Sequence, residues 1–556
     1  AKPDKEGFPS PAPGEHQIAV QAEALTSRVD GHGSHVGGWQ TFICGGKGST
    51  RTILCHAGVV RETWAKAQDA EVNIFAAWGW FNVIGRIVSV DPAEAIIRIE
   101  GRECQYPIRE GNRFFVENVR EELDAPGEWY LDSLAGRLYY WPREGSPDGK
   151  SVVAPVLNTL IHLQADVDGQ ERVQHVHLRG FTLSHTDYTT DHVSVRTAQD
   201  ATALLENAWH CSVERCRFVN VGGSGIRLHL DSRHNLIADN EVTQAGGNGV
   251  LLTAAVVDRG LLMTPGEAAA KVAPIQNTLT RNHVHHCGQI HKYVAGVHMD
   301  SRPRAMAGEP GNVVSHNHIH HMPRNGIFGF EHQGGNVLEH NRIHHVMLES
   351  DDGGGIHICQ DNTACAPTVI RHNVIHDVFG ARVDKDGRVS RQIGIGVYLD
   401  GATSSCHVTS NVICRTSMGA VFLHGGQDNI VENNILLGDH LQQFWVSNYT
   451  QRMSGNRFRR NIVQCLDPDA KAMKLMQFTP ETLAECDQNL YWHGGQPIAI
   501  DPIGTLADWQ QKGYDARSLV ADPQFADPAH DDYSLKPGSP ALELGFVPIS
   551  KIKDDR

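Results

Sequence analysis

The chain has no run of about 18 apolar residues, so the sequence predicts no segment that spans a bilayer. It also lacks a surplus of positive charge. Its 49 lysines and arginines stand against 64 aspartates and glutamates, a formal charge of −15. An acidic chain has no electrostatic attraction to nucleic acid or to an anionic membrane. The sequence therefore predicts neither a nucleic-acid partner nor a membrane span.

Cysteine is scarce, with 12 in 556 residues and no Cys-X-X-Cys pair. This excludes a small disulfide-dense scaffold. Three pairs are close enough in sequence to form disulfides, although proximity fixes no geometry. They are Cys211/Cys216, Cys359/Cys365 and Cys406/Cys414. The chain begins at Ala1 and not at Met, as a processed product would.

Histidine and glycine are abundant, with 33 and 55 residues. In the middle of the chain, asparagines introduce short apolar segments such as NHVHH and NRIHH, and each is followed by a strand that begins with glycine, such as GVHM and GIHI. The repeated asparagines are Asn240, Asn282, Asn317, Asn341, Asn373, Asn411, Asn434 and Asn461. The shortest intervals between them are 24 and 23 residues, with almost no helical periodicity. This pattern predicts an all-β parallel solenoid whose coils stack about 4.8 Å apart and whose asparagines form an amide ladder.

Residues 1–150 have a different pattern and predict a small β-sandwich-like module. Alternating segments at 82–90, 95–100 and 113–119 predict strands, and EWYLDSLAGRLYYWP at 128–142 predicts a hairpin that turns at Ala135-Gly136. Residues 151–556 then form the solenoid and its terminal coil. Within them, residues 465–520 depart from the repeat and predict loops, with a short amphipathic helix at 506–512.

Three segments resemble the secreted right-handed parallel β-helix proteins that act on polysaccharides. They are WYLDSLAGRLYYWP from residue 129, DGGGIH…GVYLDG between residues 352 and 401, and DPQFADP…YSLKPGSPA from residue 522. The family they resemble is glycoside hydrolase family 141, which includes α-L-fucosidases and xylanases. The resemblance implies a right-handed parallel β-helix and a secreted or periplasmic location. Family members usually begin with β-helix coils, whereas AKPDKEGF resembles a point inside the insertion that follows them.

Strand alternation sets the register of the coils. In GVYLD, inward Val397 and Leu399 leave Tyr398 and Asp400 pointing outward. Aligned on the leading glycine, the same outward columns hold His298 and Asp300, Phe328 and Phe330, and His357 and Cys359. Aromatic, acidic and imidazole groups on one solvent-facing surface are typical of a sugar-binding groove. The candidate substrate-binding residues are His298, Asp300, Glu331, Asp351, His357 and Tyr398.

Glycoside hydrolysis needs one protonated carboxyl group as acid and one ionised carboxyl group as nucleophile or base. The resemblance implies Asp352 as the general acid and Asp400 as the nucleophile or base. Asp352 precedes the leading glycine of its strand by three residues and Asp400 follows the equivalent glycine by four. At about 3.3 Å per residue, a straight strand would hold them too far apart. The glycines after Asp352 are therefore predicted to bend the chain inward.

Other assignments stay open at this point. Asp351, Asp300, Glu331 and Asp361 are substitutes for either carboxyl group, and Asp-Gly is also an ordinary turn sequence. His285, His320, His344 and His376 share one register, and stacked imidazoles suit a transition metal. No cysteine or carboxylate completes a tetrahedral set, so the sequence favours a hydrogen-bonded histidine ladder, with no metal and no cofactor.

The sequence thus predicts a glycoside hydrolase that cleaves a plant or algal polysaccharide or oligosaccharide. A polysaccharide lyase or epimerase acting on a uronate polymer is the alternative enzyme. It would need a cation to neutralise the uronate and a Lys or Arg base. The nearby cations are Arg302, Arg304, Arg324, Arg371 and Lys292. A non-catalytic carbohydrate-binding β-helix is the third possibility. In each case carbohydrate is the expected partner, with no oligomeric state specified.

Overall fold

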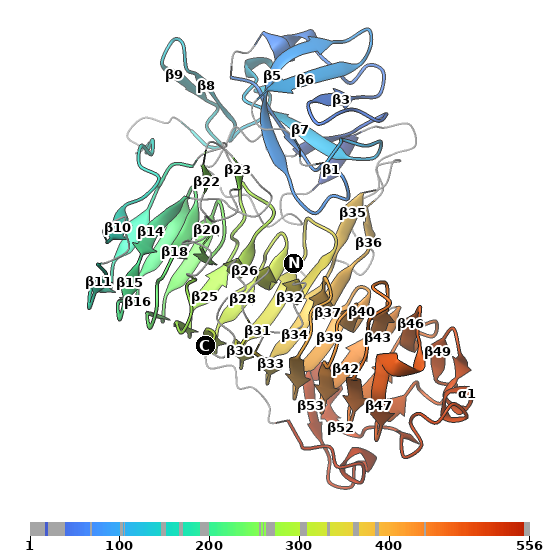
Figure 1. The fold of residues 1–556 in the computed structure, drawn as a ribbon. Coiled ribbons are helices and arrows are strands. Elements are labelled where there is room, and N and C mark those ends of the chain that lie inside the picture. Colours follow the sequence, from blue (N-terminus) through green and yellow to red (C-terminus); the bar gives the residue numbers. More distant parts are fainter. Residues whose placement is uncertain are drawn as a thin grey trace.

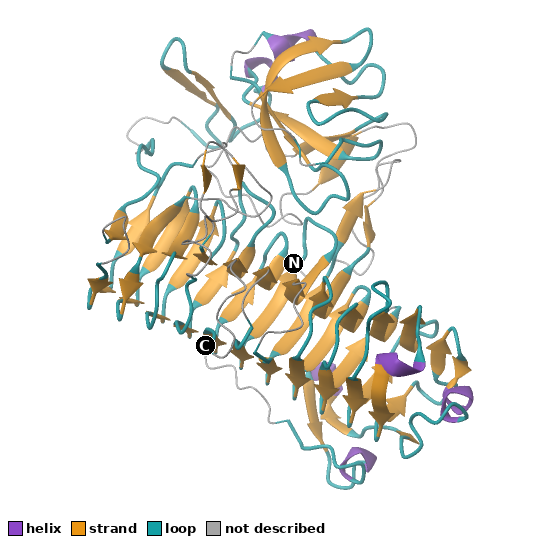
Figure 2. Cartoon of the chain, viewed as in Figure 1, coloured by secondary structure: helices purple, strands orange, loops and turns teal. Residues whose placement is uncertain are grey.

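The computed structural model describes residues 17–20, 39–66, 69–100, 104, 106–145, 152–165, 171–188, 200–254, 257–258, 261–262, 273–300, 309–330, 334–359, 366–383, 389–438 and 441–549. These residues are almost entirely strand and loop, with a few short helical turns (Figure 2). Within them no helix is long and apolar enough to cross a membrane. The cysteines in these ranges are all free.

From β10 onward the chain winds into a long parallel β-helix with three sheets (Figure 1). We call the first the site sheet. Its strands, in order of pairing, are β10 (Ile161–Gln164), β14 (Ala201–Glu206), β18 (Ser224–His229), β21 (Val250–Thr253), β26 (Ala295–Asp300), β29 (Asn325–Phe330), β32 (Gly353–Cys359), β37 (Gly394–Asp400), β40 (Gly419–His424), β43 (Gln442–Ser447), β46 (Lys471–Met476), β49 (Ala499–Asp501) and β50 (Gly504–Thr505).

We call the second the histidine sheet. Its strands are β13 (Thr182–Ser184), β17 (Arg217–Val221), β20 (Glu241–Ala245), β25 (His283–His285), β28 (His318–His320), β31 (Arg342–Val346), β34 (Val374–Val378), β39 (Val412–Thr416), β42 (Ile435–Gly438), β45 (Ile462–Cys465), β48 (Leu490–Trp492) and β51 (Leu519–Val520). The third sheet contains β12 (His177–Arg179), β16 (Ser212–Glu214), β19 (Leu236–Ala238), β24 (Thr278–Thr280), β27 (Val313–Ser315), β30 (Val337–Glu339), β33 (Thr368–Arg371), β38 (Cys406–Thr409), β41 (Ile430–Glu432), β44 (Asn456–Arg459) and β47 (Leu483–Asp487).

Alternation along the strands fills the solenoid interior with aliphatic side chains. Val397 of β37 pairs with Ile356 of β32 and with Val421 of β40, and all three are fully buried. The glycine that leads several of the site-sheet strands leaves room for the facing sheet. A Cβ atom on Gly396 would lie 2.2 Å from Cγ2 of Ile413, so no larger residue fits there without displacing the histidine sheet.

The predicted amide ladder is confirmed. Nδ2 of Asn317 donates to Oδ1 of Asn341 at 3.0 Å, and Nδ2 of Asn341 donates to Oδ1 of Asn373 at the same distance. The same bond joins Asn240 to Asn282 at 2.9 Å and continues to Asn461. Because each amide is buried, the ladder satisfies polar groups that water does not reach and holds successive coils in register.

Residues 465–520 correct the sequence analysis. They were expected to be loops, but β46, β47, β48, β49 and β51 continue the three sheets of the solenoid. Their intervals lack the leading glycine that marks the earlier coils, so the repeat is hidden in the sequence. The expected helix is present as α1 (Leu506–Gln510), which begins after the N-cap Thr505.

The N-terminal strands form one seven-stranded antiparallel sheet with its own hydrophobic core. In order of pairing they are β1 (Gln17–Val20), β2 (Trp39–Ile43), β7 (Arg113–Glu117), β4 (Glu71–Ile74), β5 (Val83–Asp91), β6 (Ile96–Glu100) and β3 (Thr52–Leu54). The predicted hairpin is β8 (Trp129–Asp132) and β9 (Arg137–Tyr140), which turns where expected.

Smaller elements complete the fold. They are the strand pairs β11 (Val173–Gln174) with β15 (Ala208–Trp209), β22 (Val257–Asp258) with β23 (Leu261–Leu262), β35 (Ala381–Val383) with β36 (Val389–Arg391), and β52 (Phe525–Asp527) with β53 (Asp532–Leu535), and the 3-10 turns η1 (Glu62–Ala65), η2 (Arg120–Glu122), η4 (Pro480–Thr482), η5 (Pro528–His530) and η6 (Pro540–Leu542).

The N-terminal sheet packs beside the middle coils, where the β35–β36 hairpin reaches toward it (Figure 1). Asn82 makes two bonds across this boundary: its Nδ2 donates to the carbonyl of Ile290 at 2.9 Å, and its Oδ1 accepts from the N–H of Lys292 at 2.7 Å. Arg113 of β7 donates to the carbonyl of Glu349. The sheet is thus fixed next to the turn that carries Asp351 and Asp352.

Candidate active site

The structure brings Asp352 and Asp400 together. Asp352 directly precedes β32, and Asp400 ends the neighbouring strand β37. The hydroxyl of Tyr398 donates to Oδ1 of Asp352 at 3.3 Å and lies 3.5 Å from Nδ1 of His424. That nitrogen lies 2.7 Å from Oδ1 of Asp400. A short chain of polar contacts therefore joins the two carboxyl groups.

The bend that allows this meeting lies at Asp352 itself and not in the glycines, which corrects the sequence analysis. Asp352 is in the left-handed region, with φ of +59°. This conformation is costly for a residue with a side chain and persists only where its surroundings fix it. Here Arg324 fixes it: its Nη1 donates to the carbonyl of Asp351 at 2.8 Å and its Nη2 to the carbonyl of Asp352 at 2.7 Å.

The two carboxyl groups differ in their electrostatic surroundings. Burial, and then the neighbouring Asp400 carboxylate, raise the pKa of Asp352. Burial also acts to raise the pKa of Asp400, but hydrogen bonds from His357 and His424 outweigh it and hold that pKa well below its ordinary value. The pair is therefore arranged to share one proton, with the proton on Asp352 and the negative charge on Asp400.

His424 is a site residue that the sequence analysis missed. It occupies the outward column of Asp400, one coil further along. The alignment used the leading glycine of each strand, and Ala420 stands at that position in β40. Matching the segment VFLH to VYLD would have placed His424 beside Asp400.

The predicted outward columns are in the expected register, but they do not form an open groove. The rings of His357, Tyr398 and Phe422 stack in sequence, with centroid separations of 4.5 and 4.8 Å, and Phe328 packs at a tilt against His357 at 4.9 Å. Each ring is at most 3% exposed. The expectation that these residues form a solvent-facing surface is therefore wrong, because each ring covers the next.

The structure gives the contacts of three residues that were predicted to bind substrate, His357, Tyr398 and His298. His357 keeps a polar role, because its Nε2 lies 3.4 Å from Oδ2 of Asp400. Tyr398 reaches Asp352 as described above. His298 is fully buried, with Nδ1 3.1 Å from Oδ1 of Asn248 and its ring 5.0 Å from Phe328. We assign His298 to packing and not to sugar binding.

Asp351 is buried and supports the backbone. Its Oδ1 accepts from the N–H groups of Asp352 and Ile393, each at 2.8 Å. Burial raises the pKa of Asp351 to about 6. The remaining candidates cannot be placed: the side chain of Asp300, and all of Glu331 and Asp361, lie outside the described residues.

The cations proposed for a lyase are bonded to other protein groups, as far as the structure describes them. Arg324 is buried and holds the Asp351-Asp352 turn. Lys292 is buried against Glu349, with Nζ 3.1 Å from Oε1. Arg371 pairs with Glu339 on the third sheet. Arg302 and Arg304 lie outside the described residues.

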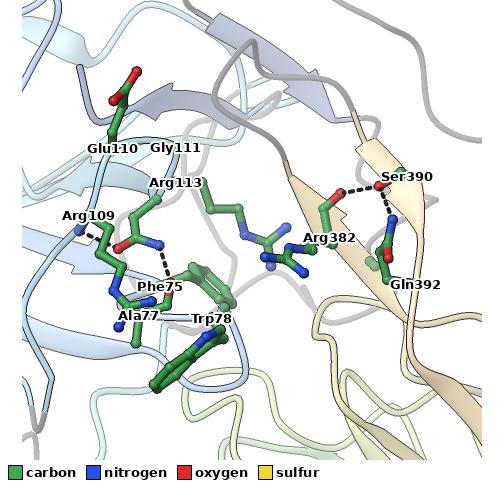
Figure 3. Close-up of a pocket in the computed structure, with 13 residues that line it drawn as sticks. Phe75, Ala77, Trp78, Arg109, Glu110, Gly111, Arg113, Arg382, Ser390 and Gln392 are labelled. Carbon is green, nitrogen blue, oxygen red and sulfur yellow. Dashed lines mark hydrogen bonds between the residues drawn. The ribbon is translucent and has the colours of Figure 1, made fainter. Parts of the chain in front are cut away.

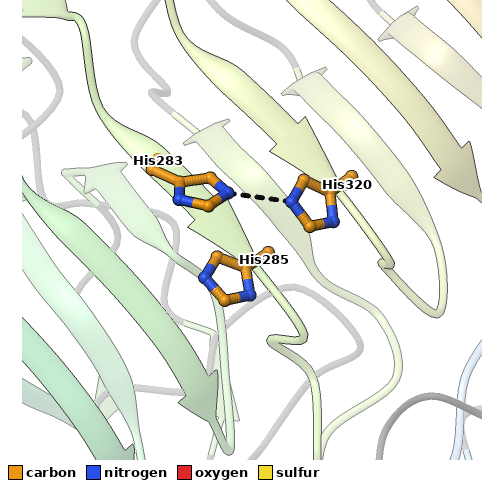
Figure 4. A group of neighbouring side chains, drawn as sticks. All are labelled: His283, His285 and His320. Carbon is orange, nitrogen blue, oxygen red and sulfur yellow. Dashed lines mark hydrogen bonds between the residues drawn. The ribbon is translucent and has the colours of Figure 1, made fainter. Parts of the chain in front are cut away.

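The predicted histidine ladder runs along the histidine sheet. The rings of His285, His320, His344 and His376 stack at 4.9, 4.9 and 4.8 Å. His283 crosses to the next coil, where its Nε2 lies 2.8 Å from Nε2 of His320 (Figure 4). One nitrogen of such a pair donates a proton and the other accepts it. Hydrogen bonding within the ladder is therefore the arrangement that the structure shows.

Three groups of side chains could hold a metal ion among the residues that the structure describes. In each, one ligand atom per residue lies within 4.8 Å of the others. The groups are His283/His285/His320, His286/His320/His321 and His357/Cys359/Asp400.

Family comparison bears on the whole architecture. The model described as "GH141 insertion domain" matches residues 104–143, which include the β8–β9 hairpin. The model described as "Right handed beta helix region" matches residues 201–390. The chain carries a family 141 insertion domain on a right-handed β-helix. The expected resemblance and the expected fold class are thereby confirmed.

Solved structures align with parts of this chain. A glycoside hydrolase aligns with a TM-score of 0.51 and 17% identity, covering 80% of this chain and 72% of that one. XylC in complex with xylose aligns with a TM-score of 0.36 and 10% identity over 64% of this chain and 54% of that one. PfbA, a surface adhesin of Streptococcus pneumoniae, aligns with a TM-score of 0.38 and 12% identity over 58% and 76%. The similarity to the glycoside hydrolase, at 17% identity, shows the fold alone.

One curated sequence is related over a shorter stretch. RNA 3'-terminal phosphate cyclase of Methanococcoides burtonii is 32% identical over 140 residues, which are 24% of this chain. The chain matches 37% of the length of that relative.

Proposed function

We propose that this GH141-like protein hydrolyses a glycosidic bond in a plant or algal polysaccharide or oligosaccharide. The observation that carries the proposal is the chain of contacts through Tyr398 and His424 that joins Asp352 to Asp400, with the pKa raised for Asp352 and lowered for Asp400. Pairs whose environments separate their pKa values in this way supply an acid and a base at one pH. Such a substrate also suits a secreted or periplasmic location.

In this proposal Asp352 is the general acid. Its raised pKa keeps it protonated, so that it can transfer a proton to the leaving oxygen as the glycosidic bond breaks. The Tyr398 hydroxyl, 3.3 Å from Oδ1, orients the carboxyl group. Because Asp352 is buried beside the ionised Asp400, it holds its proton until the leaving oxygen of the substrate accepts it.

Asp400 is the ionised partner, acting as nucleophile or as base toward water. His424 at 2.7 Å and His357 at 3.4 Å bond its two oxygens and keep it charged at low pH. The same two imidazoles fix the direction of the carboxylate. A group held in one orientation meets the anomeric carbon without further loss of rotational freedom.

Release of nitrophenol from a panel of nitrophenyl glycosides, including α-L-fucoside and β-xyloside, tests hydrolysis. We expect one of them to be cleaved, and Asp352→Asn and Asp400→Asn both to lower the rate. Asp239→Asn is the matched control, because Asp239 pairs with Arg281 away from the site. If no glycoside is cleaved and acidic polymers yield a product with the absorbance of an unsaturated uronate, the reaction is elimination and not hydrolysis.

A further inference from the structure

A cavity of about 480 Å³ lies between the N-terminal sheet and the β35–β36 hairpin of the solenoid. Trp78, Arg109 and Arg113 line it from the N-terminal side, and Arg382, Ser390 and Gln392 line it from the hairpin (Figure 3). Its size is within the range of small-ligand sites, about 300–1,000 Å³. The catalytic proposal uses none of these side chains.

Three guanidinium groups give the cavity a positive charge, in a chain whose formal charge is −15. Arg113 and Arg382 point toward one another from opposite walls (Figure 3). Among the described residues they and Arg109 have one ion-pair partner, Asp351, whose Oδ2 lies 3.8 Å from Nη1 of Arg382. Glu110 also lines the cavity, but its carboxyl group points away from them (Figure 3).

Arg113 is the least hydrated of the three. It is buried, its guanidinium lies 3.8 Å from the centre of the Phe75 ring, and it donates to a carbonyl and not to a carboxylate. Burial lowers the pKa of Arg113 to about 10, although the nearby Glu349 carboxylate acts to raise it, so Arg113 stays charged at neutral pH. A buried cation is stabilised by an anion that reaches it.

The cavity is connected directly to the carboxyl pair. Asp351, beside Arg382, is the residue before Asp352. The N–H of Ile393, the residue after Gln392, donates to Asp351 at 2.8 Å. Arg324, from the neighbouring coil, bonds the carbonyl of Trp80 at 3.0 Å and that of Asp352 at 2.7 Å. The walls of the cavity are therefore bonded to the turn that carries Asp352.

We propose that this cavity binds an acidic sugar, one that carries a carboxylate or a sulfate ester, next to the sugar whose bond is cleaved. Guanidinium groups bind carboxylate and sulfate through paired hydrogen bonds. The indole of Trp78 is 41% accessible, and the guanidinium of Arg109 lies 4.3 Å from the centre of its ring. The opposite face of the indole is the one on which a sugar ring would stack. The substrate is then an acidic glycan, a class that the proposed function does not specify. This inference rests on the proposed function for the position of the cleaved bond.

Calorimetric binding to Asp400→Asn protein, which is not expected to turn over substrate, tests the cavity apart from catalysis. The probes are an oligogalacturonate, its methyl ester, a sulfated fucose oligomer and its desulfated form. We expect at least tenfold tighter binding of an acidic probe than of its neutral form. The first pair reports on carboxylate and the second on sulfate. Equal affinity within both pairs would overturn the proposal.

Two variants locate the binding. Arg382 and Arg109 are exposed, so Arg382→Gln and Arg109→Gln should fold, which their melting temperatures will check. Each should remove most of the preference for the acidic probe, whereas Arg457→Gln, an exposed arginine on β44, should not. A preference that survives in both cavity variants would place the anion elsewhere and contradict the proposal. If acidic probes bind preferentially but no glycoside is cleaved, the proposed hydrolysis is overturned and the acidic-sugar site is retained. If a glycoside is cleaved but acidic probes are not preferred, the hydrolysis is retained and the acidic-sugar site is overturned.

Discussion

Two sheets of this solenoid carry stacked rings, and only one of them also carries a carboxyl pair. On the histidine sheet, the same residue type follows from coil to coil, and each imidazole bonds or stacks on the next. On the site sheet, the rings of Phe328, His357 and Tyr398 follow one another, and Asp352, Asp400 and His424 bond to them and to each other. The comparison shows that side chains repeated from coil to coil stabilise the stacking of the coils. The proposed catalytic residues lie where the repeated sequence pattern changes.

The largest expected difference between the sheets is catalytic. Asp400→Asn should lower kcat about 10⁴-fold on the cleaved glycoside, because it removes the ionised partner that carries the reaction. His320→Asn, the matched change in the histidine ladder, should leave kcat unchanged. Steady-state rates of the two variants check this, and a comparable loss in both would mean that the ladder takes part in catalysis.

A smaller loss should follow from releasing the turn that breaks the repeat. Arg324→Gln keeps a polar side chain but loses the fork that binds the carbonyls of Asp351 and Asp352. Misplacement of a catalytic group by about 1 Å costs about 100-fold in rate. We expect that loss in kcat, together with a lower melting temperature. Arg281→Gln, on the third-sheet side, is the control, and full activity of Arg324→Gln would show that the turn holds without its clamp.

Stability should depend on repeated residues more than on site residues. Asn341→Ala removes an amide that bonds two neighbouring coils and leaves their buried partners unsatisfied. The expected cost is about 1–3 kcal/mol in the free energy of unfolding, measured with denaturant. Tyr398→Phe, which removes one bond at the site, should cost less. The reverse order would contradict the assignment of the ladder to scaffold.

A separate expected effect is on the pH dependence of stability. Burial, and then neighbouring imidazoles, lower the pKa of His286 to about 3 and that of His321 to about 4. The unfolded chain takes up protons below about pH 6.5, where these folded imidazoles stay neutral. The free energy of unfolding should therefore fall as the pH decreases from about 6.5 toward 4. Melting temperatures measured across this pH range should show the decline, and the double variant His286→Asn/His321→Asn should show a shallower one. An unchanged slope in the double variant would mean that these residues are not responsible.

Sequence periodicity was enough to predict the solenoid, the asparagine ladder and the register of the outward columns, because each depends on spacing along the chain. It could not show that Asp352 and Asp400 meet. That depends on the left-handed conformation of Asp352, which a residue from the preceding coil, Arg324, holds. Burial of His298 and His357 was also missed, because it depends on which rings lie against them in neighbouring coils and not on their position in the strand.

The roles of the two aspartates are tested most directly by changing the leaving group. An alkyl leaving group, as in a methyl glycoside, needs a proton to depart, whereas dinitrophenolate departs without one. If Asp352 is the acid, Asp352→Asn should lose about 10³-fold on the poor leaving group and only about tenfold on the dinitrophenyl glycoside. Asp400→Asn should lose activity equally on both. An equal loss on both substrates for Asp352→Asn would contradict its assignment as the general acid.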